Sequence, residues 1–173
     1  MFFKNLWNYI VGKRRKVVIA SIDAVACYNR GIIYYCSGKY QKAIDNYTKA
    51  IELDPEFAFA YFNRGIAYTK SGEYQKAIDD YTKAIELNPE DANVYYTRGI
   101  VYAIQKLPTT ACDDFCQAGL LYLKQGNRTQ SIRCVDLMKR IDPLSFLTKK
   151  LIDKIYKKPK KIYKKLKKLK KKN

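Results

Sequence analysis

Apolar and polar residues alternate at helical spacing through most of the chain, and the pattern repeats. Residues 31–55 recur 34 positions later as residues 65–89, with 19 of 25 residues identical. In the second copy, two stripes of aromatic and small residues have the spacing of three and four that is typical of amphipathic helices: Tyr61, Gly65 and Tyr68, then Tyr74, Ala77, Tyr81 and Ala84. Each copy is therefore predicted to be an antiparallel pair of helices that stacks on its neighbours to bury its apolar faces.

Turn-forming residues separate the predicted helices. Ser37-Gly38 and Ser71-Gly72 supply the break within each pair. Pro55 and Pro89 end each unit, because proline denies the chain its next backbone donor.

The chain departs from this period after residue 105. A third unit begins in phase, but Lys106-Leu107-Pro108 stands where the glycine turn belongs. The next register starts at Gly119, only 20 residues after Gly99. One helix must therefore serve both the third unit and the next, and we predict helices over residues 109–125, 129–141 and 144–156.

The repeated residues resemble the signature of the tetratricopeptide repeat family. The first unit matches that signature with Gly31, Tyr34, Gly38, Tyr40, Ala43, Tyr47, Ala50 and Pro55. The second unit matches it with Gly65, Tyr68, Gly72, Tyr74, Ala77, Tyr81, Ala84 and Pro89. The resemblance implies an all-α solenoid of antiparallel helix hairpins, with about three repeat units and extra carboxyl-terminal helices.

Three parts of the chain follow from this interpretation. Residues 1–22 are an apolar and basic amino-terminal segment, residues 23–143 the repeat domain, and residues 144–173 a helix followed by a lysine-rich tail. Within the repeat domain we expect units at about 24–57, 58–91 and 92–125, and a partial unit at 126–143.

The resemblance also implies a binding surface, because the first helices of successive hairpins line a concave groove in this family. The residues expected to face the groove are mostly aromatic or aliphatic: Tyr28, Asn29, Ile32, Tyr35, Phe59, Phe62, Asn63, Ile66, Asn93, Tyr96 and Ile100. Asn29 and Asn63 are expected to bond a peptide backbone, which suits an extended or helical peptide. In the alternative interpretation, the ends of the chain itself cover part of this row.

Family members that bind the acidic carboxy-terminal peptide of heat-shock chaperones use lysines and asparagines of the first helices. Asn63 matches one such position. The other positions of this clamp are occupied by different residues, which are Tyr28, Ile32, Asn93 and Thr97. Binding of a chaperone tail is therefore not expected.

An arginine directly precedes the first signature glycine of each unit, at Arg30, Arg64 and Arg98. The three could form a ladder for an anionic ligand. An aspartate at the matching place in each second helix favours structural ion pairs instead, with Asp45, Asp79 and Asp113 as the expected partners.

The excess positive charge lies at the two ends of the chain. The formal net charge is +18; residues 1–16 carry five cations and no acid, and residues 149–173 carry 14 lysines against one aspartate. The amino end suits either a membrane interface or a cap on the solenoid, because one helical face gathers Phe3, Leu6, Trp7, Ile10 and Val11.

The lysine-rich tail leaves three interpretations open. Its lysines would be attracted to an anionic membrane surface, or to nucleic acid through counterion release. Without arginine, only nonspecific binding to nucleic acid is expected. The third interpretation is a solvated tail that binds nothing.

Catalytic and cofactor chemistry is not indicated. The chain has no histidine, and neither Gly12-Lys13 nor Gly38-Lys39 belongs to a phosphate-binding loop. Cys112 and Cys116 share a helix face, but no second pair completes a zinc site. We therefore expect no enzymatic activity, cofactor, metal or small-molecule substrate.

The leading hypothesis is an interaction adaptor or scaffold that binds a protein or peptide in its groove. We expect it in a reducing cytoplasm, because the five cysteines do not form a dense disulfide framework. The alternatives are a peripheral membrane protein attached through its basic ends, and nonspecific association with nucleic acid.

Overall fold

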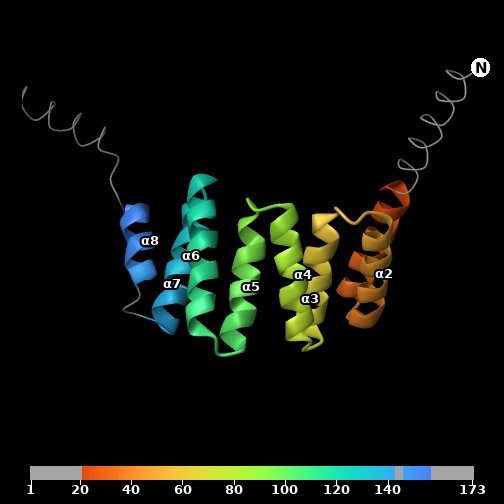
Figure 1. Ribbon diagram of the computed structural model, residues 1–173, viewed down its shortest axis with the longest axis horizontal. Helices are drawn as coiled ribbons and strands as arrows, with labels where there is room; N and C mark the ends of the chain where they lie inside the picture. Colours follow the sequence, from red (N-terminus) through yellow and green to blue (C-terminus); the bar gives the residue numbers. More distant parts are fainter. Residues whose placement is uncertain (1–20, 143–145, 157–173) are drawn as a thin grey trace, which may run out of the picture.

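A computed structural model describes residues 21–142 and 146–156, and all regular secondary structure in these residues is helical. Residues 21–36 form the first described helix, called helix 21–36 below. The others are α2 (Tyr40–Leu53), α3 (Ala58–Lys70), α4 (Tyr74–Leu87), α5 (Ala92–Ile104), α6 (Pro108–Lys124), α7 (Arg128–Ile141) and α8 (Phe146–Tyr156). They stand side by side in chain order along one axis (Figure 1), which confirms the predicted all-α hairpin solenoid.

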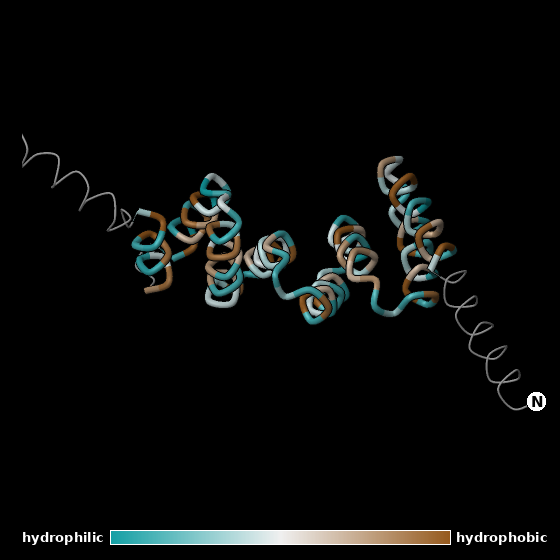
Figure 2. The backbone as a smooth tube through the Cα atoms, turned by 90° about the horizontal axis from the view of Figure 1, so that it is seen from above, coloured by the Kyte–Doolittle hydropathy of each residue, from teal (hydrophilic) through white to brown (hydrophobic). Residues whose placement is uncertain are grey.

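Seen along the helices, the array is not flat. Successive helices zigzag about the long axis, and apolar segments recur on each of them (Figure 2). The stripes predicted from the sequence account for this packing: Ala77, Tyr81 and Ala84 of α4 are buried, as are their equivalents Ala43, Tyr47 and Ala50 of α2.

Within each hairpin, an aromatic ring of the second helix lies directly on a glycine of the first. A Cβ atom built at Gly65 would lie only 2.6 Å from Cε1 of Tyr81, and one built at Gly31 would lie 2.5 Å from Cε1 of Tyr47. In the third hairpin the ring is that of Phe115, which lies over Gly99. Glycine is required at Gly31 and Gly65, because a side chain there would overlap the ring and push the two helices apart.

The turns between paired helices share one backbone geometry. Gly38, Gly72 and Gly126 have positive φ values of 71°, 79° and 78°, and Lys106 adopts the same conformation with φ of 60°. After Lys106, the amide of Leu107 donates to the carbonyl of Tyr102 at 2.9 Å, which closes the first helix of the unit as a Schellman motif does. The missing glycine of the third unit is therefore replaced without a change of fold.

The shared helix predicted from the sequence is present. α6 begins with Pro108 in its first turn and packs against both α5 and α7, while α8 packs on α6 and α7. A Cβ atom built at Gly119 would lie 2.6 Å from Cδ2 of Leu151 and 3.3 Å from Cβ of Cys134. α6 thus acts as the second helix toward α5 and as the first helix toward α7.

The predictions for the two ends fall outside the described residues. These are the apolar and basic segment over residues 1–16 and the lysine-rich tail over residues 157–173. Among the described residues, no helix has the length and hydropathy that a membrane crossing requires.

Replacing Lys106 by glycine is expected to stabilise the protein. A side chain in the left-handed region costs about 1 kcal/mol, which glycine avoids. Urea unfolding of the full chain, followed by circular dichroism, measures the change. Lys39→Gly is the matched control, because Lys39 also lies between paired helices but has an ordinary φ of −90°. An equal gain in stability for that variant would contradict the explanation.

Candidate functional site

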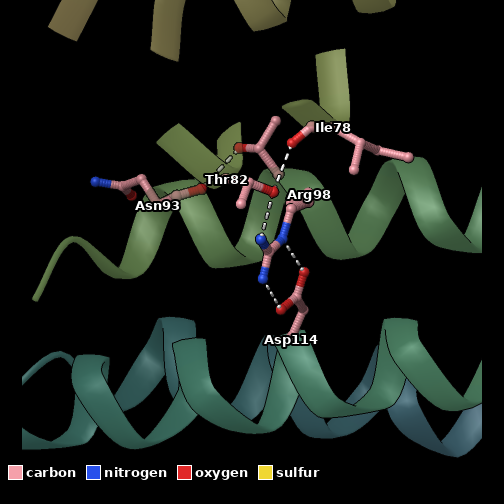
Figure 3. Close-up of polar contacts among 6 residues, drawn as sticks. Ile78, Thr82, Asn93, Arg98 and Asp114 are labelled. Carbon is pink, nitrogen blue, oxygen red and sulfur yellow. Dashed lines mark hydrogen bonds and ion pairs between the residues drawn. The ribbon is translucent and has the colours of Figure 1, made fainter. Parts of the chain in front are cut away.

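A buried polar interlock joins the second hairpin, α3–α4, to the first and the third hairpin, α5–α6, to the second. Nε and Nη2 of Arg98 on α5 donate to the two carboxylate oxygens of Asp114 on α6, at 2.8 and 2.9 Å. Nη1 of Arg98 donates to Oγ1 of Thr82 on α4 at 2.9 Å, and that hydroxyl donates to the carbonyl of Ile78 at 2.8 Å. Figure 3 shows this arrangement. One arginine therefore connects three helices that belong to two hairpins.

The interlock repeats one unit earlier. Arg64 on α3 binds both carboxylate oxygens of Asp80 on α4, at 2.7 and 2.8 Å, and reaches Oγ1 of Thr48 on α2 at 3.0 Å. Burial lowers the pKa of the Arg64 guanidinium, but the hydrogen bonds and charge of Asp80 outweigh this effect and hold that pKa above its usual value. The arginine stays charged and fully engaged within the fold.

The aspartates predicted as partners were wrong by one residue. Arg64 and Arg98 pair with Asp80 and Asp114 rather than with Asp79 and Asp113. Asp79 lies on the exposed side of α4, where it accepts a hydrogen bond from Gln75. Two aspartates stand next to each other in the sequence, and only the packing angle of the second helix decides which one points inward.

The first unit lacks the interlock. Its position equivalent to Asp80 is Asn46, which is buried and donates to the carbonyl of Lys42 at 2.8 Å. Asp45, the partner predicted for Arg30, instead accepts a hydrogen bond from Gln41. Arg30 is exposed and has no partner among the described residues. The three arginines are therefore not equivalent in the fold, because only Arg64 and Arg98 are paired with an aspartate.

Three of the predicted groove residues occupy the same place in successive units. The rings of Tyr28, Phe62 and Tyr96 lie 5.8, 6.0 and 5.8 Å from the buried rings of the second helices, which are those of Tyr47, Tyr81 and Phe115. Each of the three is half-buried. They therefore support the core as well as lining its surface.

Two of the predicted groove residues bond to each other across neighbouring hairpins. Nδ2 of Asn63 donates to the hydroxyl of Tyr28 at 2.8 Å and to the carbonyl of Phe59 at 3.0 Å. Burial raises the pKa of Tyr28, although this hydrogen bond opposes the effect. Both amide protons of Asn63 are thus engaged, and only its Oδ1 atom is available to a peptide backbone.

The most exposed apolar side chains of the row lie on the first two hairpins. Phe59 is 55% exposed and Ile32 is 36% exposed. Tyr35, Ile66 and Ile100 are half-buried and pack against the core. Asn29 is exposed, but helical spacing places it with Ala26 and Ile33, on the side of the helix away from α2.

At the other end of the row, the side chain of Tyr96 opens into a hollow of about 260 Å³. The remaining lining residues all belong to α7: Arg133, Asp136, Leu137 and Arg140. The charged groups that line the hollow are therefore two guanidinium groups and one carboxylate. Sequence reasoning missed these residues, although Arg133, Leu137 and Arg140 recur at spacings of four and three on one face of α7.

Asn93 is engaged next to this hollow. Its Oδ1 atom accepts a hydrogen bond from the hydroxyl of Tyr122 at 2.7 Å. Burial raises the pKa of Tyr122 to about 12, so this hydroxyl remains a donor at physiological pH. Tyr122 also places its ring 6.5 Å from that of Tyr96. The contact fixes the start of α5 against the shared helix α6.

The cysteines are not gathered into a site. Cys112, Cys116 and Cys134 are buried, and burial raises the pKa of each thiol. Cys27 is half-buried and Cys36 exposed. Within residues 21–142 and 146–156, no group of three metal-binding side chains comes together.

Comparison with known families decides the identity of this fold. Models of the tetratricopeptide repeat match residues 58–91 and 80–113, and a model of the TPR repeat matches residues 31–72. The chain belongs to the tetratricopeptide repeat family. No curated protein sequence matches it significantly.

Solved tetratricopeptide repeat domains have similar structures. The second TPR domain of Spaghetti (RPAP3), bound to the HSP90 peptide SRMEEVD, is 34% identical with a TM-score of 0.55, over 57% of this chain and 92% of that chain. The TPR2B domain of yeast Sti1, in complex with pHsp70, is 24% identical with a TM-score of 0.67, over 72% of this chain and 100% of that chain. The Arabidopsis OM64 TPR domain is 22% identical with a TM-score of 0.56, over 80% and 98%.

Replacing Asp114 by alanine is expected to destabilise this tetratricopeptide repeat protein by about 3 kcal/mol, because it leaves Arg98 buried without its counter-charge. Urea unfolding of the full chain measures the loss. Asp113→Ala is the matched control: its side chain is exposed, and its change should stay within about 0.5 kcal/mol. Equal losses for the two variants would show that the interlock has been assigned to the wrong residue.

Proposed function

We propose that this protein is a protein-interaction adaptor that binds a peptide segment along the row formed by helix 21–36, α3 and α5. The observation that carries the proposal is the hollow beside Tyr96, because it continues an apolar row that is otherwise shallow. Phe59 and Ile32 supply exposed apolar surface at one end of the row, and the hollow supplies depth and charge at the other.

The charges of the hollow suggest which peptide fits. Arg133 and Arg140 lie on the same face of α7, and Asp136 leaves a net charge of +1 among the lining residues. A guanidinium group binds a carboxylate with two parallel hydrogen bonds. The proposed ligand therefore has apolar side chains toward Phe59 and a glutamate or aspartate toward α7.

The solved relatives support a peptide ligand in general but not a particular one. The Spaghetti domain, which is 34% identical, holds an HSP90 peptide. In this chain, the polar positions expected of such a clamp are occupied differently: the hydroxyl of Tyr28 bonds Asn63, and Oδ1 of Asn93 bonds Tyr122. We therefore do not propose a chaperone tail as the ligand. The membrane and nucleic-acid alternatives concern the two ends, which lie outside the described residues.

A peptide selection followed by affinity measurement tests this function. A random dodecapeptide display library is selected on the full chain, and the recovered peptides are synthesised with a fluorophore for anisotropy titration. Phe59→Ala is expected to weaken their binding by about tenfold or more, because a buried aromatic ring contributes roughly 1.5–3 kcal/mol. Arg140→Glu is expected to lower the affinity only of those peptides that contain acidic residues.

Leu53→Ala serves as the control. Leu53, like Phe59, is a large exposed apolar side chain. It lies at the end of α2 and outside the row, so its replacement should leave the affinity unchanged. Circular dichroism verifies that all variants remain folded. Peptides whose affinity is indifferent to both Phe59→Ala and Arg140→Glu, or a selection that yields no binder, would contradict the proposed function.

A further inference from the structure

Helix 21–36 has an apolar face that its counterparts in later units bury. Ile33 is 65% exposed, whereas the equivalent residues Ala67 and Val101 are both 0% exposed. Ala26 is also exposed, whereas Ala60 and Val94 are buried. In α3 and α5 these positions pack against the preceding hairpin. Helix 21–36 therefore presents the stacking surface of a repeat, and no other helix among residues 21–142 and 146–156 covers it.

The polar part of the stacking surface is uncovered as well. Arg64 and Arg98 each reach back to a threonine of the preceding hairpin, at Thr48 and Thr82. Arg30 has the equivalent place on helix 21–36, but it has no partner among the described residues. A charged group and an apolar stripe thus lie open side by side.

The exposed stripe has the spacing of a helix-pairing seam. Ile22, Ala26, Asn29 and Ile33 follow one another at intervals of four, three and four residues, and all are exposed. This is the heptad spacing at which two helices pack along their length. The small side chain of Ala26 at the middle would allow the two helices to approach closely.

The charges beside the stripe complement those of an identical helix. Asp23 and Arg30 are both exposed and seven residues apart, so they lie on the same flank of the stripe. When a second copy of the helix runs antiparallel, with Ile22 opposite Ile33, Asp23 of one copy faces Arg30 of the other. A two-fold axis makes this pair twice, as an isologous interface requires.

The repeat register predicts cations at several core positions of the chain's own amino-terminal segment. A helix that continued the repeat backwards would occupy positions 34 residues before α2. Those positions hold Lys13, Arg14 and Lys16 where α2 has Tyr47, Thr48 and Ala50. Three cations would replace two core side chains and the threonine, and Arg14 would meet the charge of Arg30.

We propose that two copies of this protein associate through helix 21–36, which pairs antiparallel with the same helix of the second copy. Ile22 and Ile33 form the apolar contacts, and Asp23 and Arg30 form two reciprocal ion pairs. The residues proposed to make these contacts are not those proposed to bind the peptide, so the association can be tested whether or not the peptide binds.

Sedimentation velocity of the full 173-residue chain over a range of concentrations tests the association. The wild type is expected to show a reversible monomer–dimer equilibrium. Ile33→Glu is expected to raise the dimer dissociation constant by about tenfold or more, because it removes a buried isoleucine from both copies. Ile104→Glu, at a similarly exposed isoleucine of α5, is the control and should leave the constant unchanged.

Charge reversal tests the antiparallel pairing itself. Asp23→Arg and Arg30→Asp each place like charges opposite one another twice in the dimer, and each is expected to weaken it by about tenfold. The double variant D23R/R30D restores opposite charges at both pairs and should recover the affinity of the wild type. Recovery in the double variant requires both charges to change on both sides of the interface. This happens only when the second helix is a copy of the first, and not when it belongs to another protein or to the amino-terminal segment.

Deletion of residues 1–16 tests the remaining explanation, in which the amino-terminal segment covers the exposed face of helix 21–36. If the two copies pair through helix 21–36, the deletion should leave the dimer dissociation constant within about twofold of the wild-type value, because the deleted segment does not contribute to the interface. A wild type that remains monomeric, a dimer indifferent to Ile33→Glu, or a double variant without recovery would overturn the proposal. A dimer that forms only after the deletion would show that the amino-terminal segment covers the face instead.

Discussion

Each repeat is held together by an aromatic ring lying on a glycine. Because Gly31 and Gly65 have no side chain, the rings of Tyr47 and Tyr81 settle against the backbone of the first helix, at distances that no Cβ atom would permit. The buried ring then supports a second ring on the outside of the hairpin, at Tyr28 and Phe62. The aromatic layer of the proposed peptide row therefore depends on the glycine contact beneath it.

Stacking of the hairpins depends on a second contact that is polar. An arginine of one hairpin binds an aspartate of its own second helix and a threonine of the preceding hairpin, as Arg98 does with Asp114 and Thr82. Tyr95 and Tyr102 flank the guanidinium group of Arg98, and their ring centroids lie 5.9 and 5.8 Å from its Cζ atom. A bidentate, buried pair has directional requirements that apolar packing lacks, so it holds the guanidinium group in one orientation within its own hairpin. The hydrogen bond from this group to Thr82 is then the polar contact with the preceding hairpin. In the first unit Asn46 stands in place of the aspartate, and within residues 21–142 and 146–156 no further hairpin stacks on helix 21–36.

The other end of the array is shaped by a helix that serves two hairpins. α6 gives Phe115 to the core beneath α5, and its Gly119 lies against α7 and Leu151 of α8. The regular succession of first and second helices stops there, and α7 comes to border the hollow beside Tyr96. The irregular end of the solenoid therefore places Arg133 and Arg140 beside the last ring of the row.

The sequence alone determined the fold class, because a 34-residue period with glycine, aromatic and proline residues at fixed places leaves few ways to bury the apolar faces. It also indicated that one helix over residues 109–125 is shared. It could not decide between Asp79 and Asp80 as partners of Arg64, since adjacent residues differ by about 100° around a helix and only packing selects one. The hollow lined by Tyr96 and Arg140, the bond between Asn63 and Tyr28, and the open face around Ile33 were decided by the tertiary structure, because each joins or exposes residues of helices that are distant in the sequence.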